Sequence, residues 1–440
     1  MMQPSWFVGV DLGSQEHAVA IVGADGRRLR ELAIPANPLG ILQLLGVLGG
    51  APGGVAVAVE SPHNQLVEVL LDRQVPVWAI NPKQLDRLRD RHTVAGSKND
   101  RLDAYVLADS LRTDRPLFQP LAVDLPEVRA LRELSRTLEE LDKKRRQAAN
   151  QLWQLLLGYF PGLLKLCSGA DEPWLWELLR LAPTPRRAGA LSPATLAPLL
   201  RRHRITRVTA ADLQRCLAEA VTGLPAAAET VCGQHARRLV EQLVLFQAQL
   251  KEVTQQIEKT VPKPKPGEPA DPSPPPAPAA AADSSPPPAD EPAPDAEFRT
   301  ICRLVASMKG IGPKTGATLI GEAYPALREG NYAALRGRCG VAPVTRQSGK
   351  KQVVLMRRAC ARRLRNAMHY AANVAVQQVP AWGSLYARIR SRGGSHSRAL
   401  RQVADKMLKV LTAMIRTGTM FDLEKVKCRS TDFAGTTSAK

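Results

Sequence analysis

The sequence predicts an α/β domain followed by a mostly helical region, with a proline-rich linker inside the helical region. Residues 6–113 alternate strand and helix patterns, which is typical of a layered α/β domain. From Leu131 onward, leucines spaced by three and four residues indicate a coiled coil. The chain has 440 residues, so at least two hydrophobic cores are expected.

The N-terminal domain is expected to open with three antiparallel strands, because the turn-forming residues 24–26 separate two strand patterns. A continuous run of valine and alanine at 55–59 predicts a strand buried on both faces. The expected strands are 6–12, 16–23, 29–34, 55–60 and 75–80, and the expected helices are 38–48, 65–73 and 98–112.

The rest of the chain divides by composition. Two apolar seams predict two coiled-coil helices, and the proline-broken segment between them has no assigned chemistry. Residues 262–296 contain 14 prolines in 35 positions, so we expect a semi-stiff tether there. The expected parts are an α/β catalytic domain that carries four candidate acids (1–123), a coiled coil (124–160), a helical insertion (161–235), a second coiled-coil helix (236–261), the linker (262–296) and a basic helical domain (297–440).

The net charge of +20 is unevenly distributed. Residues 298–440 contain 27 basic and 6 acidic residues, whereas residues 1–297 contain 34 and 35. A neutral first part joined to a strongly cationic last part indicates a nucleic-acid partner. The sequence contains neither a long uncharged apolar run nor a secretory signal, so we expect no membrane association and a cytoplasmic location.

Four carboxylates form the first candidate site. Asp11 ends the first strand, Glu60 ends the fourth, and Asp100 and Asp103 lie three residues apart at the start of a helix. Two Mg²⁺ ions are the expected cofactor, because converging carboxylates bind such ions in phosphoryl transfer. The alternative is structural, with Asp11 in a strand-ending turn and Asp100 as a helix N-cap.

A glycine-rich segment at 308–317 forms the second candidate site. No strand precedes it and no Gly-Lys-Ser/Thr ends it, which excludes dinucleotide and Walker loops. It looks like the hairpin of a helix-hairpin-helix element, in which glycines let the backbone approach DNA and helix N–H groups hold a phosphate. The alternative is a simple helix-helix turn. The expected contacts are Lys309, Gly310, Gly312, Lys314 and Thr315.

A serine in a cationic, hairpin-like segment at 339–355 forms the third candidate site. Ser348 precedes Gly349, and its basic neighbours are suited to a phosphate, although none is an evident base. By itself this pair is more typical of a surface turn. Arginines on the next predicted helix are expected to neutralise phosphates. The expected basic contacts are Arg346, Lys350, Lys351, Arg357, Arg358, Arg362, Arg363 and Arg365.

Two family resemblances unite these segments. Residues 6–113 resemble the ribonuclease-H-like fold of RuvC-type Holliday-junction resolvases. The order of the four acids, the coiled coil, the Gly-Ile-Gly-Pro hairpin and the Gly-Val-Ala-Pro segment ending in Ser348-Gly349-Lys350 is similar to the bridge-RNA-guided insertion-sequence transposases, relatives of Piv-type DNA invertases. The resemblance implies a phosphoserine link at Ser348, donor and target DNA, a noncoding bridge RNA and a homo-oligomer, either dimer or tetramer.

The coiled coil and the tether suggest how such an oligomer is arranged. Coiled coils pair chains, and a long tether lets a C-terminal domain reach a neighbour. We therefore expect composite sites that join the acids of one protomer to Ser348 of another.

Two other functions fit part of the sequence. An actin-like kinase or ATPase also begins with Asp-x-Gly-Ser after a strand, but it needs a second acidic-glycine phosphate loop that this sequence lacks. A non-catalytic nucleic-acid-binding protein, such as a decayed transposase, would keep the basic domain without needing the four acids and the serine.

Overall fold

The computed structural model describes residues 4–62, 64–91, 99–118, 120–121, 124–219, 224–262, 296–349 and 351–423. These residues form two compact units, Met1–Leu125 and Pro126–Lys440, and each is described by itself. Most of the proline-rich segment lies outside the described residues. In the described part of the chain, no helix is long and apolar enough to cross a membrane.

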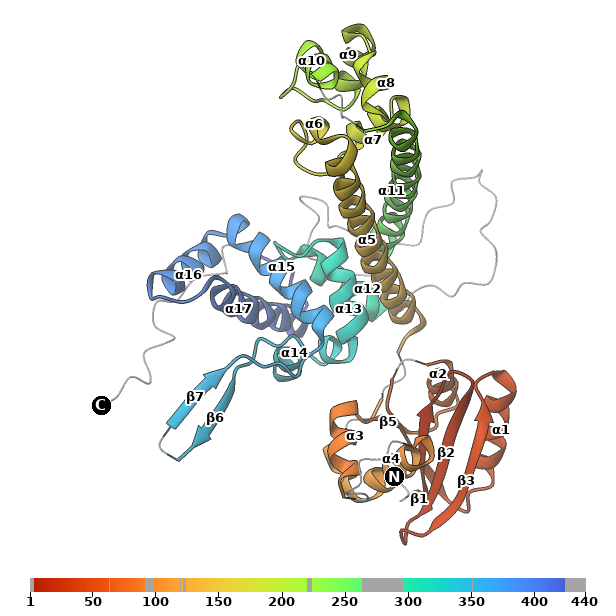
Figure 1. Cartoon of the computed structure of the whole chain (residues 1–440). Helices are drawn as coiled ribbons and strands as arrows, with labels where there is room; N and C mark the ends of the chain where they lie inside the picture. The colour runs from red at the N-terminus through yellow and green to blue at the C-terminus, as the bar shows by residue number, and fades with distance from the viewer. Residues whose placement is uncertain are drawn as a thin grey trace, which may run out of the picture. The chain divides into compact units, whose positions relative to one another are not determined.

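The first unit contains a five-stranded sheet in the order β3-β2-β1-β4-β5 (Figure 1). The first three strands are antiparallel, and β4 and β5 run parallel to β1. The sequence-based prediction of five strands is confirmed to within about two residues at each end. The strands are β1 (Pro4–Leu12), β2 (Glu16–Gly23), β3 (Arg28–Pro35), β4 (Gly54–Val59) and β5 (Val77–Ala79).

Helices cover both faces of this sheet. Val8, Val10 and Val59 pack with the helices α1 (Pro38–Gly49) and α2 (Gln65–Asp72) on one face. The other face is lined by smaller side chains and packs against α4 (Asp100–Asp114). Two further short elements, α3 (Pro82–Arg89) and a 3-10 turn (Arg115–Leu117), complete the unit.

Glycine brings α4 unusually close to the sheet. A Cβ atom at Gly9 of β1 would lie 1.9 Å from the Ala104 carbonyl oxygen and 2.6 Å from the Ala108 nitrogen. Ala56 and Ala58 of β4 leave similar room, and both are fully buried. The position of α4 therefore depends on small residues in the two central strands.

The second unit begins with two long helices that pack along each other (Figure 1). These are α5 (Pro126–Tyr159) and α11 (Ala226–Thr260), and they run antiparallel because Leu152 and Leu156 near the end of α5 share a core with Leu239 and Leu243 near the start of α11. Five helices connect them: α6 (Pro161–Leu164), α7 (Pro173–Leu181), α8 (Pro185–Gly189), α9 (Pro193–Arg202) and α10 (Ala210–Glu219).

This packing corrects one expectation from the sequence. Much of the two predicted seams is buried within one chain, including Leu131, Leu152 and Leu243. The spacing of apolar residues was interpreted as evidence for a surface that pairs two chains. Such spacing indicates only that a helix packs against another helix, in the same chain or in a second one. The coiled coil therefore gives no argument for dimer formation.

The C-terminal part of the second unit is helical with one β-hairpin, which lies within the predicted interruption at 339–355. Its helices are α12 (Ala296–Ser307), α13 (Pro313–Arg328), α14 (Tyr332–Arg338), α15 (Arg362–Gln378), α16 (Pro380–Ser391) and α17 (His396–Thr417). The hairpin consists of β6 (Val344–Ser348) and β7 (Lys351–Leu355), which are antiparallel.

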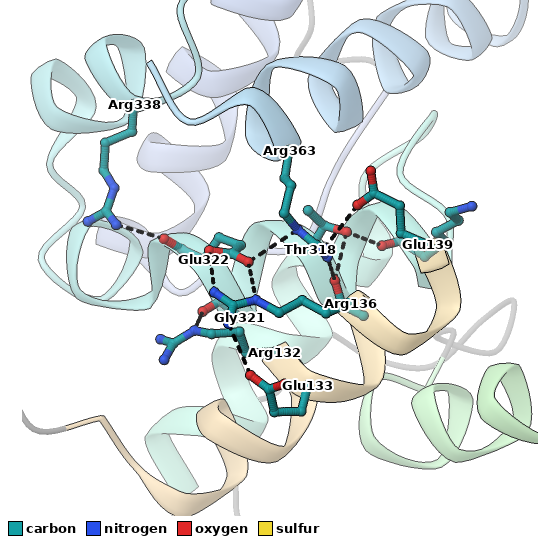
Figure 2. A network of polar contacts seen from close by, with 11 residues as sticks. Arg132, Glu133, Arg136, Glu139, Thr318, Gly321, Glu322, Arg338 and Arg363 are labelled. Carbon is teal, nitrogen blue, oxygen red and sulfur yellow. Dashed lines mark hydrogen bonds and ion pairs between the residues drawn. The ribbon is translucent and has the colours of Figure 1, made fainter. Parts of the chain in front are cut away.

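A polar network holds this C-terminal part against α5 (Figure 2). The hydroxyl groups of Ser135 and Thr318 lie 3.1 Å apart, and Arg132 donates to the Gly321 carbonyl oxygen at 2.6 Å. Arg363 of α15 donates to the Ser135 hydroxyl oxygen at 2.7 Å. We call this the α5 network; its members are Arg132, Ser135, Arg136, Glu139, Thr318, Gly321, Glu322 and Arg363.

Ion pairs strengthen the α5 network. Glu322 of α13 pairs with Arg136 at 3.1 Å and with Arg363 at 3.2 Å, and Glu139 pairs with Arg363 at 3.0 Å. In the described contacts, α13 and α15 pack on the chain's own α5. That the tether lets this domain settle on a neighbouring chain stays a prediction. The tether links two elements that already pack in one unit.

Replacing Gly321 by alanine should weaken the α5 network. The added Cβ would lie 2.8 Å from Arg132 Cα and 3.0 Å from its nitrogen, so backbone atoms must separate. We expect the free energy of unfolding in urea to fall by about 1–3 kcal/mol. Gly337→Ala in α14 is the matched control, because nothing lies within 4 Å of its added Cβ, and it should raise stability by about 0.5–1 kcal/mol. Equal unfolding free energies for the two variants would contradict this account.

Candidate active site

Asp11 and Glu60 lie at the carboxyl ends of two neighbouring parallel strands. Val10 of β1 is paired with Val59 of β4, so Asp11 and Glu60 are the next residues in register. Adjacent strands are about 4.8 Å apart. Side chains alternate along each strand, so both acids share the face of Gly9 and Ala58, which is the face that α4 covers. Both are partly exposed.

The first turn of α4 reaches the same edge. Gly9 contacts Ala104 and Ala108 in the middle of α4, and Gly26, in the turn beyond the start of β1, lies against Arg112 near its end. The helix therefore runs antiparallel to β1, with its N-terminus over the strand end that carries Asp11. Asp100 is exposed and Asp103 is 2% exposed.

The structural interpretations of Asp11 and Asp100 have different outcomes. Gly13 does form a tight turn after β1, since a Cβ there would lie 2.2 Å from the Glu16 carbonyl oxygen. Asp100, however, is not the N-cap of α4. That position is held by Asn99, whose side chain accepts a hydrogen bond from the Arg101 nitrogen at 3.0 Å.

Asp103 is bound by an arginine that sequence reasoning missed. Arg89, the last residue of α3, donates to both carboxylate oxygens of Asp103, at 2.6 and 3.0 Å. Asp86 also accepts from Arg89, at 3.2 Å. The hydrogen bond to Asp103 raises the pKa of Arg89. A buried carboxylate needs such a counter-ion, but no pattern in the sequence connects Arg89 to a partner fourteen residues away.

The four acids have the right chemistry to bind a divalent cation, but their side chains are not arranged around a common point. Carboxylate oxygens are the ligands that Mg²⁺ takes in proteins. Across the described ranges, no group of three or more His, Cys, Asp or Glu side chains is placed to hold a metal ion. Both oxygens of Asp103 are bonded to Arg89, so a cation at this carboxylate would either share it with the guanidinium or displace the guanidinium. Residues 92–98, which precede α4, lie outside the described residues.

Ser348 lies at the tip of the β6–β7 hairpin. It pairs with Lys351 across the turn, and Gly349 has a φ of +57°, a left-handed conformation that glycine adopts without strain. Ser348 and Arg346 are exposed. Lys350 lies outside the described residues, and only the backbone of Lys351 is described. Within the described part of the chain, no side chain hydrogen-bonds to the Ser348 hydroxyl.

The glycine-rich segment forms a turn between α12 and α13, where Gly312 is the N-cap and Pro313 the first residue of α13. Gly310 has a φ of +90°, and a Cβ there would lie 2.6 Å from Ala375 Cβ. The backbone at Gly310 therefore approaches α15 closely, which gives this glycine a structural reason; its contact with DNA stays a prediction. Gly312 is exposed and has open space around it.

The predicted basic contacts separate into two groups. Lys309, Arg358 and Arg362 are exposed. Lys314, also exposed, has its amine 3.6 Å from the Asp142 carboxylate, and Thr315 is half-buried. Others are used inside the protein: Arg363 belongs to the α5 network, Arg365 packs near Gly340, and Arg357 is partly buried.

Comparison with known proteins relates both units to transposases. A DEDD transposase model of the IS110 type matches residues 8–161, and a model described as the transposase IS116/IS110/IS902 family matches residues 302–388. The mini-circle protein assigned as the transposase of IS117, from Streptomyces coelicolor, is 30% identical over 430 residues, which cover 95% of this chain and 96% of the relative.

Two further relatives agree with these matches. The protein y4uE of Sinorhizobium fredii, assigned as a transposase, is 42% identical over 219 residues, which cover 49% of this chain and 61% of the relative. A 43.6 kDa protein of insertion element IS110 from Streptomyces coelicolor is 25% identical over 438 residues, covering 94% of this chain and 95% of the relative.

Removing Arg89 should destabilise the first unit. Arg89→Ala leaves the buried Asp103 carboxylate without its counter-ion, so we expect a loss of about 3 kcal/mol in the free energy of unfolding. Arg91→Ala is the matched control. The Arg91–Asp114 pair is equally short, at 2.6 Å, but the arginine side chain is 57% exposed, so its loss should cost less than about 1 kcal/mol. Urea denaturation measures both, and a smaller loss for Arg89→Ala than for Arg91→Ala would contradict the assignment.

Proposed function

This chain belongs to the IS116/IS110/IS902 family of transposases, which mobilise insertion elements, and on that basis we propose that it cuts and rejoins donor and target DNA through a covalent link to Ser348. The observation that carries the proposal is the acidic edge of the first unit. Asp11 and Glu60 occupy matching positions on parallel strands, under the α4 turn that carries Asp103. The match to transposase models at both ends of the chain leaves no support for an actin-like kinase.

The chemistry of the serine step is a phosphoryl exchange. An Oγ–P bond forms at Ser348 as a P–O bond to a DNA sugar breaks, and the sugar oxygen leaves as a hydroxyl with the proton that Ser348 loses. Attack of a sugar hydroxyl on the phosphoserine reverses the step and rejoins DNA. Exposure of Ser348 at a hairpin tip, next to exposed Arg346, supports this role because a DNA phosphate can reach it.

The four acids are the proposed binding site for Mg²⁺, with two ions as the working expectation. When bound, Mg²⁺ would stabilise charge on the attacking and leaving oxygens. The chain's own contribution is to present Asp11, Glu60, Asp100 and Asp103 at one sheet edge, and to neutralise the buried Asp103 with Arg89. The proposed fold of this unit is ribonuclease-H-like, which the order of its five strands supports.

The proposed partners are donor and target DNA, a noncoding bridge RNA and further copies of this chain, in the cytoplasm. The basic C-terminal region supports nucleic-acid partners, because residues 330–404 contain 15 Lys and Arg and no Asp or Glu. From the family resemblance we propose that the chain forms a dimer or a tetramer. We also propose composite sites that join the acids of one protomer to Ser348 of another, because the acids and Ser348 belong to different units.

Loss of one acid should abolish recombination without affecting RNA binding. Asp11→Ala, Glu60→Ala and Asp103→Asn each remove a proposed ligand, and we expect recombination to fall by about two orders of magnitude or more. Asp103→Asn is preferred to alanine because it still accepts from Arg89. Asp25→Ala, at the opposite end of the sheet, is the control. Recombination at the wild-type rate in Asp11→Ala or Glu60→Ala would exclude these acids from the reaction.

Ser348→Ala should eliminate the covalent protein–DNA product. The variant keeps the hairpin backbone but lacks the attacking hydroxyl, so no denaturant-resistant band should form with a nicked substrate that traps the intermediate. Ser384→Ala is the control, because it replaces an exposed serine that lies in α16. This variant should form the band at the wild-type level. An unchanged band in Ser348→Ala would reject this nucleophile.

A further inference from the structure

Four rings from three helices form a continuous row in the C-terminal domain. His369 and Tyr370 lie on α15, Tyr386 on α16 and His396 on α17. Successive ring centroids are 6.1 Å apart for Tyr370 and His369, 6.3 Å for His369 and His396, and 5.8 Å for His396 and Tyr386. The Tyr386 hydroxyl lies 2.8 Å from His396 Nδ1, which ties α16 to α17. We call these four residues the ring row.

The ring row is not part of the core. Aromatic residues make up only 4% of this chain, and the large ones are mostly buried, such as Trp174, Trp382 and Phe298. Tyr370, in contrast, is 65% exposed, and His396 is also exposed. The Tyr370 ring is therefore accessible to a ligand from solvent.

Arg401, which acts electrostatically on His369, and Arg398 lie on the same helix as His396, and residues 330–404 contain no Asp or Glu. Arg401 of α17 contacts the Met356 sulfur at 2.9 Å, and Arg398 and Arg362 are exposed. The two acids nearest to this span in the sequence are Glu329 and Asp405. Asp405 is bonded to Arg336 and Tyr332, and Glu329 precedes α14 in the sequence. A phosphate backbone near these helices would thus meet positive charge only.

The surroundings of His369 favour its uncharged form. Burial lowers the pKa of His369, and the neighbouring His396 and Arg401 lower it further. Neighbouring rings meet edge to face, at 76° between His369 and Tyr370 and 89° between His369 and His396, so each exposed ring offers its own face. Aromatic rings bordered by arginines are the combination with which proteins bind unpaired bases, which stack on the rings while phosphates meet the cations.

We propose that the ring row is a stacking platform for unpaired nucleotides of a single-stranded nucleic acid. Tyr370 offers the most exposed ring, and Arg398 and Arg401 lie on the helix that carries His396, where they hold the adjoining phosphates. Stacking does not read the sugar, so single strands of RNA and DNA both fit, whereas a duplex hides its base faces. This site requires neither Ser348 nor the acids, so it goes beyond the proposed recombination.

The test is binding of the full chain to labelled 20-nucleotide strands of oligo(U) and oligo(dT), and to a duplex, by fluorescence anisotropy. The buffer contains EDTA, so DNA cleavage does not enter the measurement. Tyr370→Leu keeps apolar bulk but removes the ring, and should weaken binding of both single strands about tenfold, the effect of losing one stacked base. Tyr370→Trp should bind like the wild type, and the duplex should be affected less than twofold, in line with stacking.

Val374→Ala is the matched control, since this residue lies one turn further along α15 and is 41% exposed. It should leave all three affinities unchanged. Tyr386→Phe keeps its ring and loses only the hydrogen bond to His396, so it should retain single-strand binding. Wild-type affinity for single strands in Tyr370→Leu would overturn the proposal, as would an equal loss for the duplex, which would indicate an electrostatic or folding effect.

Discussion

The close contact between α4 and the sheet at Gly9 is the constraint on which the acidic edge depends. No larger residue fits there, because the Ala104 carbonyl oxygen would be 1.9 Å from a Cβ. This contact sets the height of α4 above β1, and the antiparallel direction of the helix then brings its first turn over the ends of β1 and β4. Backbone packing thus brings the acids to one edge of the sheet, and their own charges oppose the arrangement.

That opposition explains the role of Arg89. Asp103 is nearly fully buried, and a buried carboxylate without a partner costs several kcal/mol. The bidentate bond from Arg89 removes this cost in the structure described, and a cation bound by the acids could replace it. The same arginine therefore stabilises the fold and competes with the ion that the proposed chemistry uses.

The sequence predicted local features better than long-range ones. Strand ends at Asp11 and Glu60 followed from apolar runs and turn residues, and the edge they share followed from the α/β pattern. The partner of Arg363 could not be predicted from the sequence, because Ser135 lies 228 residues earlier in the chain. Similarly, the spacing of Leu131 and Leu152 indicated a helix partner without telling whether that partner is α11 or another chain. The glycine-rich pattern singled out Gly310, but it did not indicate that the backbone of Gly310 approaches α15.

The α5 network makes the helices α13 and α15 part of the same unit as the long hairpin of α5 and α11, whereas the acids belong to the other unit. The proposed catalysis would thus join residues that do not share a fold unit. The most direct test is to trap the reaction on a nicked DNA, digest the protein with trypsin and identify the DNA-linked peptide by mass spectrometry. The account predicts linkage on the peptide 347–350, which contains Ser348, and only when a divalent cation is present. Linkage at another residue, or the same linkage in EDTA, would contradict it.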